Sequence, residues 1–252
     1  MVLNQQQQNL CDENTTDFAD LKAVLINTSL KLKSDESHTR LLMGVSGDIM
    51  AANGIAVEHI HLLDHQLALG VQPDMTEHGW DRDDFPKLWE TIRAADILVI
   101  GTPIWLGEES SACRVLIERL YGMSGLLNDK GQSIYYGKTG GTVITGNEDG
   151  IKHCAMTILY ALQHLGYTIP PQADCGWIGE AGPGPSYGDD LDSGPAGFDN
   201  EFTQRNTTIM TWNLMHMARM LKDASGLPNH GNDRNAWKAG CRFDHDNPDY
   251  RR

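Results

Sequence analysis

The sequence has few cysteines, and no two of them lie close together. They stand at Cys11, Cys113, Cys154, Cys175 and Cys241, with no CxxC pair among them. Zinc sites and compact iron–sulfur sites need close pairs, and disulfide frameworks are dense in cysteine, so the spacing argues against all three. Sparse, separated cysteines suit a reducing compartment, and we expect a cytoplasmic protein.

Positive charge is also scarce. The chain has 20 Lys and Arg against 34 Asp and Glu, a formal net charge of −14, and no long basic stripe stands out. A nucleic acid or an anionic membrane is therefore disfavoured as a partner. Long apolar runs are lacking as well, which argues against insertion into a membrane. Residues 1–20 have neither the basic leader nor the apolar core of a signal peptide, and we expect them to form a mobile polar tail.

What the sequence does contain is enough for one sizeable α/β domain. The chain has 252 residues, of which 40% are hydrophobic. We assign the domain to residues 21–225, including a long loop rich in proline and glycine at 171–199. Residues 226–252 have little helical or strand pattern, and we expect an irregular tail that covers the domain or a neighbouring subunit.

Short apolar runs typical of strands alternate with segments of helical periodicity. Strands are expected at 22–28, 55–60, 96–102, 139–145 and 167–170, and helices at 37–53, 87–95, 110–121, 151–165 and 201–222. Repeated strand–helix units imply right-handed crossovers, which predicts a doubly wound five-stranded parallel sheet with helices on both faces. Ligands of such sheets bind outside the carboxyl ends of the strands. The loops after the first, third and fourth strands are therefore the informative ones.

The first of these loops combines hydroxyl groups with positive charge. Ser29, Ser37 and Thr39 lie within "NTSLKLKSDESHTR" together with Lys31, and the segment leads into a helix. Hydroxyls and N–H groups at a helix start favour a phosphate. The loop matches neither GxxxxGK[ST] nor GxGxxG, so a nucleoside triphosphate or a Rossmann dinucleotide is not indicated. The alternative is a capped helix preceded by a solvated basic loop.

The second loop places an aromatic residue between a proline and a glycine. Pro103 has no N–H with which to continue a parallel ladder, so we expect the chain to turn there, and Gly107 permits a tight fold around Trp105. Trp105 could stack on a flat ring, or it could plug the top of the core. The third loop, "TGNEDG" at 145–150, is by itself a routine turn before a helix.

Two other motifs indicate different chemistry and are set aside. "GPSYG" at 184–188 matches the GxSxG nucleophile elbow of serine hydrolases. That elbow needs a strand running straight into it and a helix straight out, and the flanking sequence offers neither. His59, His61 and His65 could together seat a metal, but histidines at a strand end are more often polar loop residues.

Taken in chain order, the three loops resemble those of flavodoxin-like flavoproteins of the NADPH-dependent FMN reductase and quinone reductase type. The resemblance covers about residues 22 to 170. It implies an FMN whose phosphate lies against the first loop, with its ring along the second loop and the third loop at the other edge. The cofactor-binding residues that it implies are Ser29, Lys31, Ser37, His38, Thr39, Thr102, Pro103, Ile104, Trp105, Leu106, Gly107, Thr145, Gly146, Asn147, Glu148 and Gly150. It implies no obligatory catalytic side chain and no metal.

The resemblance also implies an activity. We expect NADPH or NADH to pass a hydride to FMN, which then reduces a quinone or a similar small acceptor, in a homodimer or homotetramer. A flavodoxin-like single-electron carrier without turnover is the main alternative, and an FMN-binding sensor is a weaker one. Aromatic residues in loop 171–199 (Trp177, Tyr187) and in the tail (Trp237, Phe243, Tyr250) could cover the flavin pocket of their own or a neighbouring subunit, or merely pad the sheet.

Overall fold

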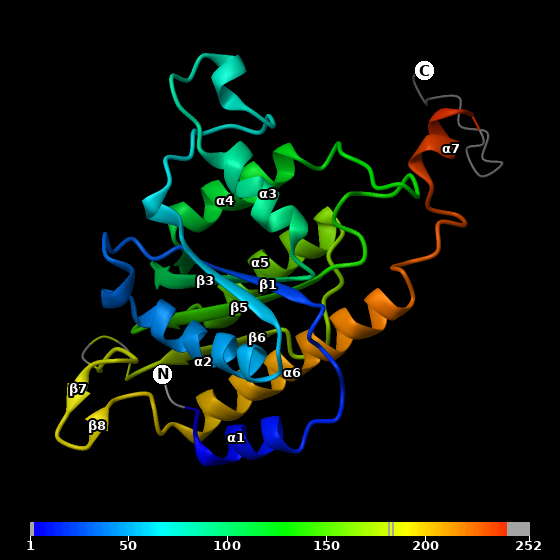
Figure 1. Ribbon diagram of the computed structural model, residues 1–252. Helices are drawn as coiled ribbons and strands as arrows, with labels where there is room; N and C mark the ends of the chain where they lie inside the picture. The colour runs from blue at the N-terminus through cyan, green and yellow to red at the C-terminus, as the bar shows by residue number, and fades with distance from the viewer. Residues whose placement is uncertain (1–2, 181, 183, 241–252) are drawn as a thin grey trace.

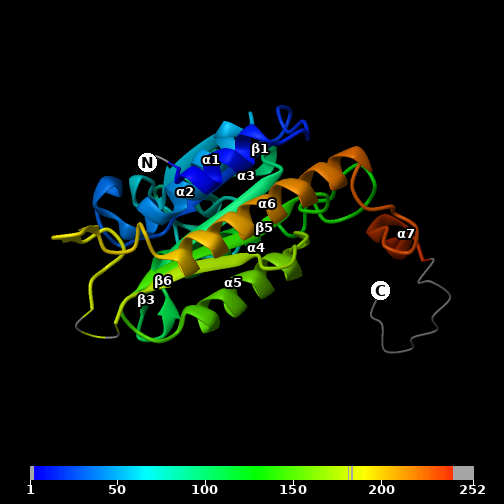
Figure 2. The same cartoon turned by 90° about the horizontal axis from the view of Figure 1, so that it is seen from below.

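A parallel sheet with helices on both faces forms the centre of the molecule (Figures 1 and 2). The computed structural model describes residues 3–180, 182 and 184–240. The strands are β1 (Lys22–Asn27), β2 (Ala56–His61), β3 (Ile97–Trp105), β5 (Thr139–Gly146) and β6 (Asp174–Ile178), in the spatial order β2-β1-β3-β5-β6. The predicted flavodoxin-like fold class, with five parallel strands, is confirmed.

The two faces of the sheet are covered by different helices. One face carries α3 (Phe85–Ala94), α4 (Ser111–Gly122) and α5 (Ile151–Leu165), and the other carries α2 (His38–Ala52) and α6 (Glu201–Asp223). Short helical turns η1 (Ser34–Glu36), η2 (Leu62–Asp64) and η3 (Met75–His78) lie in the connections.

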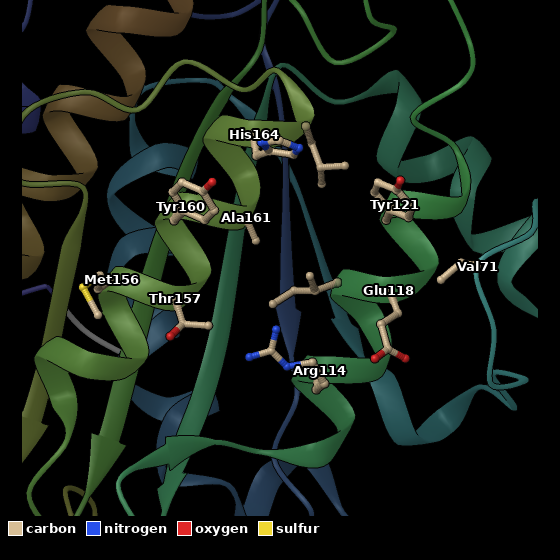
Figure 3. Close-up of a pocket in the computed structure, with 11 residues that line it drawn as sticks. Val71, Arg114, Glu118, Tyr121, Met156, Thr157, Tyr160, Ala161 and His164 are labelled. Carbon is tan, nitrogen blue, oxygen red and sulfur yellow. The ribbon is translucent and has the colours of Figure 1, made fainter. Parts of the chain in front are cut away.

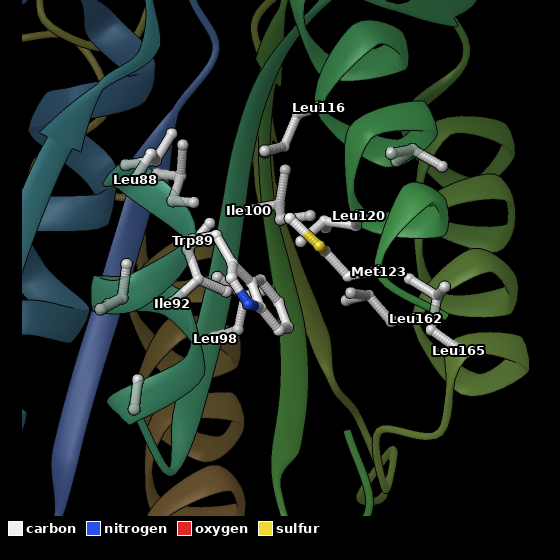
Figure 4. Packing of buried hydrophobic residues seen from close by; sticks show 14 of the residues in the cluster. Leu88, Trp89, Ile92, Leu98, Ile100, Leu116, Leu120, Met123, Leu162 and Leu165 are labelled. Atoms are coloured by element: carbon white, nitrogen blue, oxygen red, sulfur yellow. The ribbon is translucent and has the colours of Figure 1, made fainter. Parts of the chain in front are cut away.

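Alternation along the strands supplies a core on each face. Val24 and Ile26 of β1 pack with α3, α4 and α5, whereas Ala23 and Leu25 pack with α2 and α6. Successive side chains of a strand point to opposite faces, so an unbroken apolar run serves both cores. Figure 4 shows the core between the sheet and helices α3, α4 and α5, where Trp89 of α3 lies among leucines and isoleucines of the neighbouring elements.

The last strand lies later in the chain than the sequence predicted. Residues 167–170 form no strand: Thr168 makes only an isolated bridge to Thr139. The strand at this edge is β6, which pairs with β5 from Asp174 to Ile178. Pro170 and Pro171 have no N–H groups to donate to a ladder, which is the physical reason that the predicted segment does not continue as a strand.

β3 also differs from the prediction, because it does not end at Pro103. It runs on to Trp105 and pairs with β5 as far as Pro103 and Thr145. The carbonyl of Gly101 accepts the N–H of Thr28 on the β1 side, and backbone groups two residues apart point the same way. The ring nitrogen of Pro103 therefore faces the side where β1 has already ended, and no ladder bond is lost.

The N-terminal segment is not a disengaged tail in the described part of the chain. Residues Gln5–Asp12 form helix α1, whose capping box joins Asn4 and Gln7, and Phe18 is buried under α6 with an exposed fraction of 1%. The loop assigned to 171–199 contains β6 and a small hairpin of β7 (Asp190–Leu191) and β8 (Gly194–Pro195).

The C-terminal tail contains a short helix, α7 (Arg234–Lys238), at the opposite end of the molecule from the β7–β8 hairpin in both views (Figures 1 and 2). Phe243 and Tyr250 lie outside the described residues. Among the helices that the structure describes, none has the length and apolar character to cross a membrane.

Candidate functional site

The three predicted loops meet in one pocket at the carboxyl ends of the strands. It has a volume of about 430 Å³. Its lining residues are Ser29, Leu30, Lys31, His38, Thr39, Pro103, Ile104, Trp105, Thr145, Gly146, Asn147, Glu148, Ser186 and Tyr187. The remaining candidates, Ser37, Thr102, Leu106, Gly107 and Gly150, are not among the lining residues. The structure thus assembles most of the candidate set from loops far apart in sequence.

A buried hydrogen-bond network fixes the first loop. The side chain of Asn27, at the end of β1, contacts Nδ1 of His61 at 3.1 Å, and its Oδ1 accepts from the N–H of Ser29. Nε2 of His61 lies 2.8 Å from the carbonyl of Lys31. Ser37 donates its hydroxyl to Asn27 and caps α2 by accepting the N–H of Arg40. Ser37 therefore supports the first loop without lining the pocket. Asn27 and His61 also support this loop, and the sequence did not predict that role.

Hydroxyl groups also join the first loop to the third. Thr39 in the first turn of α2 and Thr145 at the end of β5 have their Oγ1 atoms 2.7 Å apart, and both residues are buried. The first N–H groups of a helix have no partner within it, so the start of α2 presents donors beside these hydroxyls. Hydroxyls and helix N–H groups together suit an anion at this end of the pocket.

The second loop is a tight β-hairpin that presents Trp105. Strands β3 and β4 (Glu108–Glu109) pair antiparallel through Trp105 and Glu108, with Leu106 and Gly107 as the two turn residues. Both turn residues have positive φ, 53° and 81°, as a type I′ hairpin requires. Trp105 is 54% exposed while lining the pocket, so it is not a plug of the core. Leu106 is 91% exposed and donates its N–H to Glu148.

Two candidate glycines hold the loops together from outside the pocket. A Cβ added to Gly150, where φ is 129°, would come within 2.6 Å of the carbonyl oxygen of Gly107. The backbones of the second and third loops are therefore in direct contact, which only a residue without a side chain permits at position 150. Thr102, another candidate that does not line the pocket, is buried, and its hydroxyl accepts the N–H of Ser110 just before α4.

A fourth segment, residues 184–189, closes one side of the pocket, and we call it the flap. Ser186 and Tyr187 of the flap line the pocket, and both belong to the "GPSYG" motif that was set aside as a nucleophile elbow. The N–H of Gly188 donates to Nδ1 of His38 at 2.9 Å. Tyr187 is one of the loop aromatics for which the sequence left open a place over the pocket, whereas Ser186 and Gly188 lie in a proline- and glycine-rich stretch whose sequence gives no signal for their contacts.

The flap also sets the electrostatics of His38. Its Nε2 lies 3.4 Å from Asp189. Burial lowers the pKa of His38, the charge of Lys31 lowers it further, and Asp189 opposes both effects. Because Nδ1 accepts from Gly188, the neutral ring carries its proton on Nε2, where it faces Asp189.

A second hollow lies away from these loops, between α4 and α5. This α4–α5 groove has a volume of about 580 Å³, and Figure 3 shows side chains of the two helices facing each other across it. Its lining is dominated by apolar and aromatic groups, among them Ile117, Tyr121, Met156 and Tyr160. The lining residues lie mostly on these two helices, and the N–H donors at the start of α2 are not among them.

The residues of the pocket at the strand ends fit FMN. One end offers the N-terminus of α2, the hydroxyls of Ser29 and Thr39, and the cationic side chain of Lys31, which suit a phosphate. The other end is bounded by the hairpin and the third loop, where Pro103, Trp105 and the backbone at Gly146 suit a flat ring.

Comparisons with known proteins agree with this fit. A family model described as NADPH-dependent FMN reductase matches residues 21–176. A protein of Streptomyces davaonensis named 8-demethyl-8-aminoriboflavin-5′-phosphate synthase is 37% identical over 209 residues, covering 81% of this chain and 79% of that protein. The crystal structure of RosB with bound 8-demethyl-8-formylriboflavin-5′-phosphate has 34% sequence identity and a TM-score of 0.78, covering 92% of this chain and 90% of that chain.

A third relative matches over only part of its length. A Mycobacterium bovis protein named divalent metal cation transporter MntH is 58% identical over 205 residues, which are 81% of this chain but 30% of that protein. The present chain thus spans less than a third of that relative. An oxidoreductase of Corynebacterium diphtheriae, with 15% identity and a TM-score of 0.53, shares the fold. With a family model matched over more than half its length, the chain belongs to the NADPH-dependent FMN reductase family.

Proposed function

We propose that this protein is a cytoplasmic reductase that binds FMN in the strand-end pocket and takes NADPH or NADH as its reductant and a quinone or similar small molecule as its acceptor. The observation that carries the proposal is that one cavity joins an anion seat at the start of α2 to a slot for a flat ring beside Trp105. When bound, FMN supplies the redox chemistry, taking a hydride from the nicotinamide and delivering two electrons to the acceptor.

The protein's own residues would bind and orient. Ser29, Lys31 and Thr39 would hold the phosphate together with the first N–H groups of α2. Pro103 and Trp105 would lie along the ring. Glu148 would not act as a base, because it already accepts the N–H of Leu106 and thereby fixes the hairpin.

The flap, which covers one side of the pocket, supports an enzyme over an electron carrier. Trp105 is half exposed, and the side chain of Leu106 is almost fully exposed, at the rim of the pocket. A nicotinamide and an acceptor could reach the ring at this rim in turn. The flap covers another side of the pocket, whereas a carrier should leave its flavin edge bare to a docking protein.

The spectrum of the protein with FMN, before and after anaerobic NADPH, tests the proposal. We expect the bound flavin to bleach within seconds to minutes of NADPH or NADH addition, and a quinone to restore its colour over many cycles. Flavin that is reduced only through a separate reductase protein would assign the carrier function instead. Failure of the purified protein to bind FMN would remove the proposal altogether.

A second candidate function is favoured by the reach of one comparison. The family match ends at residue 176, whereas the likeness to RosB covers 92% of this chain. It thus extends to the part of the chain that follows residue 176, where the flap contributes Ser186 to the pocket. In this second function the protein would bind a riboflavin phosphate as its substrate and chemically modify the flavin ring. Mass spectrometry of FMN recovered after incubation with the protein and candidate co-substrates separates the two: a reductase returns FMN of unchanged mass.

A further inference from the structure

The flap touches two different loops of the pocket. Gly188 donates its N–H to His38 of the first loop. Ser186 donates its hydroxyl to Oδ1 of Asn147 in the third loop at 3.2 Å, and the amide of Asn147 donates to the carbonyl of Gly184. The flap is thus hydrogen-bonded to His38 and Asn147, which belong to two different loops.

The flap is itself fixed through Tyr187. This side chain is fully buried, with its ring 5.2 Å from that of Phe198 and 6.2 Å from that of Trp177, measured between centroids. Its hydroxyl oxygen accepts from Nε2 of Gln204 in α6 at 2.9 Å. Burial of the phenol raises its pKa to about 12, so the hydroxyl stays neutral.

The hydrogen bonds continue from Gln204 to the N-terminal helix. Nε2 of Gln7 in α1 donates to Oε1 of Gln204 at 3.2 Å and to Thr208 at 3.1 Å. Oε1 of Gln7 accepts the N–H of Asn4 in the capping box. Both glutamines are buried, with exposed fractions of 3% and 8%. Each side-chain amide has one orientation that satisfies all its partners. The hydrogen bonds therefore all donate in one direction, from Gln7 of α1 towards Tyr187.

We propose that Gln7 is a positioning residue of the flavin pocket. Acting through Gln204 and Tyr187, it holds the flap against His38 and Asn147 and so slows the escape of FMN. We call the chain Gln7–Gln204–Tyr187 the strap. The inference rests on the proposed function for its ligand, but the strap lies outside the segment matched by the family model, residues 21–176, at both of its ends.

The test compares Gln7→Leu and Tyr187→Phe with the matched control Gln8→Leu. Gln8 lies on the same helix but is exposed, and its side chain donates to Asp12 of the same helix. Tyr187→Phe keeps the buried ring and removes only the hydroxyl. The rate of FMN loss, followed by fluorescence after dilution, should rise roughly three- to tenfold in both strap variants, which is the factor one hydrogen bond supplies. The control should match the parent protein.

A double variant distinguishes the strap from general loss of stability. If the three residues act as one chain, Gln7→Leu with Tyr187→Phe should release FMN no faster than the more affected single variant. Effects that multiply would overturn the proposal.

Hydrogen–deuterium exchange of residues 184–189 without flavin supplies a readout that does not need FMN. Faster exchange in both strap variants supports the strap, and exchange equal to that of the parent overturns it. A protein that never binds FMN would contradict the proposed function while this measurement still decides on the strap.

Discussion

Trp105 and Thr39 border the same pocket but offer a flavin different kinds of contact. Stacking on Trp105 should contribute about 0.5–1.5 kcal/mol beyond its buried area. Hydrogen bonds to a charged phosphate are worth roughly 1.5–3 kcal/mol each, and hydroxyls of the first loop converge at the start of α2. We therefore expect the phosphate end to dominate affinity, and Trp105 to set the pose of the ring.

The double variant Ser29→Ala with Thr39→Ala should weaken FMN binding by about tenfold or more, at about 1.4 kcal/mol per tenfold. Trp105→Ala should lose less affinity but change turnover with NADPH more. Ser37 is left intact because it caps α2 and holds Asn27, so its replacement would disturb the loop itself. Titration of FMN into each apoprotein decides the order, and a larger loss with Trp105→Ala would reverse the assignment.

His59 gives the protein an acid-sensitive residue outside the pocket. Burial lowers its pKa to about 4, with Arg40 lowering it further and Asp48 opposing. The unfolded chain binds a proton at this residue below about pH 6.5, whereas the folded chain does so only near pH 4, so stability falls as the pH drops through this window. His59→Gln should remove about 2–3 kcal/mol of that loss between pH 7 and pH 4.

Urea unfolding of His59→Gln at pH 7 and at pH 4.5 measures this effect, because the difference between the two pH values should shrink in the variant. The exposed His78 supplies the control, and His78→Gln should retain the pH dependence of the parent. An equal loss in all three proteins would contradict the assignment to His59.

At the scale of elements, the connection between β2 and α3 is organised by one buried ion pair. Arg119 of α4 and Asp83 are both fully buried, and Nη2 lies 2.6 Å from Oδ2. Arg119 also donates to the carbonyls of Gln72 and Pro73. One side chain thus satisfies several backbone carbonyls of the segment between β2 and α3.

Removing one partner of a buried pair leaves the other charge without compensation, so Arg119→Met should lower the free energy of unfolding by about 3–5 kcal/mol. Arg93→Met in α3 is the comparison, because Arg93 and Glu90 form an exposed pair whose loss should cost less than about 1 kcal/mol. Denaturant titrations of the two variants measure the difference, and similar losses would show that the ion pair does not organise this connection.

Elements were predictable where a local pattern coincided with their packing. The helix at α5 has an apolar stripe and a glycine stop, and its predicted bounds match the structure. α1 was missed because "QQQQNLCD" has no apolar stripe, and its one buried residue is a glutamine held by hydrogen bonds. β6 was missed because "DCGWI" lacks strand periodicity, and its place depends on pairing with β5.

The meeting of the three loops in one pocket was predictable from the order of the strands. Parallel strands bring their carboxyl ends together, so loops that follow them meet whatever their sequence separation. Asn27 and His61 support the first loop through contacts between neighbouring strands, and the flap reaches His38 across 150 residues. Such contacts depend on the whole fold, and no local pattern encodes them.

At the scale of the whole molecule, the α4–α5 groove is where we expect a second copy to dock. Tyr121, Met156 and Tyr160 are 52%, 62% and 65% exposed there, more apolar surface than single scattered residues provide. Arg114 and Glu118 lie one helical turn apart on α4 at its rim (Figure 3). Arg114 is already paired with Glu109 of its own chain, so the exposed apolar side chains carry the expectation of a symmetric dimer.

Tyr160→Glu should convert the protein to a monomer, because it buries a charge in that interface. Met220→Glu on α6 is the matched control, since Met220 is similarly exposed at 57% but far from the groove in sequence and on the other face of the sheet. Light scattering during gel filtration measures the mass of each variant. A parent protein that is already monomeric, or a Tyr160→Glu dimer, would contradict the expectation.

The contact between Gln7 and Gln204 joins residues 197 positions apart, and this has a consequence for how the protein is made. A ribosome releases α1 before the three loops and α6 after them, so all three loops leave it before the anchor of Tyr187 exists. Closing so long a stretch of chain also has an entropic cost that local contacts avoid. A nascent chain arrested before α6 would have every loop of the pocket and no anchored flap, so under the proposed role of the strap firm retention of a flavin requires α6 to have been made.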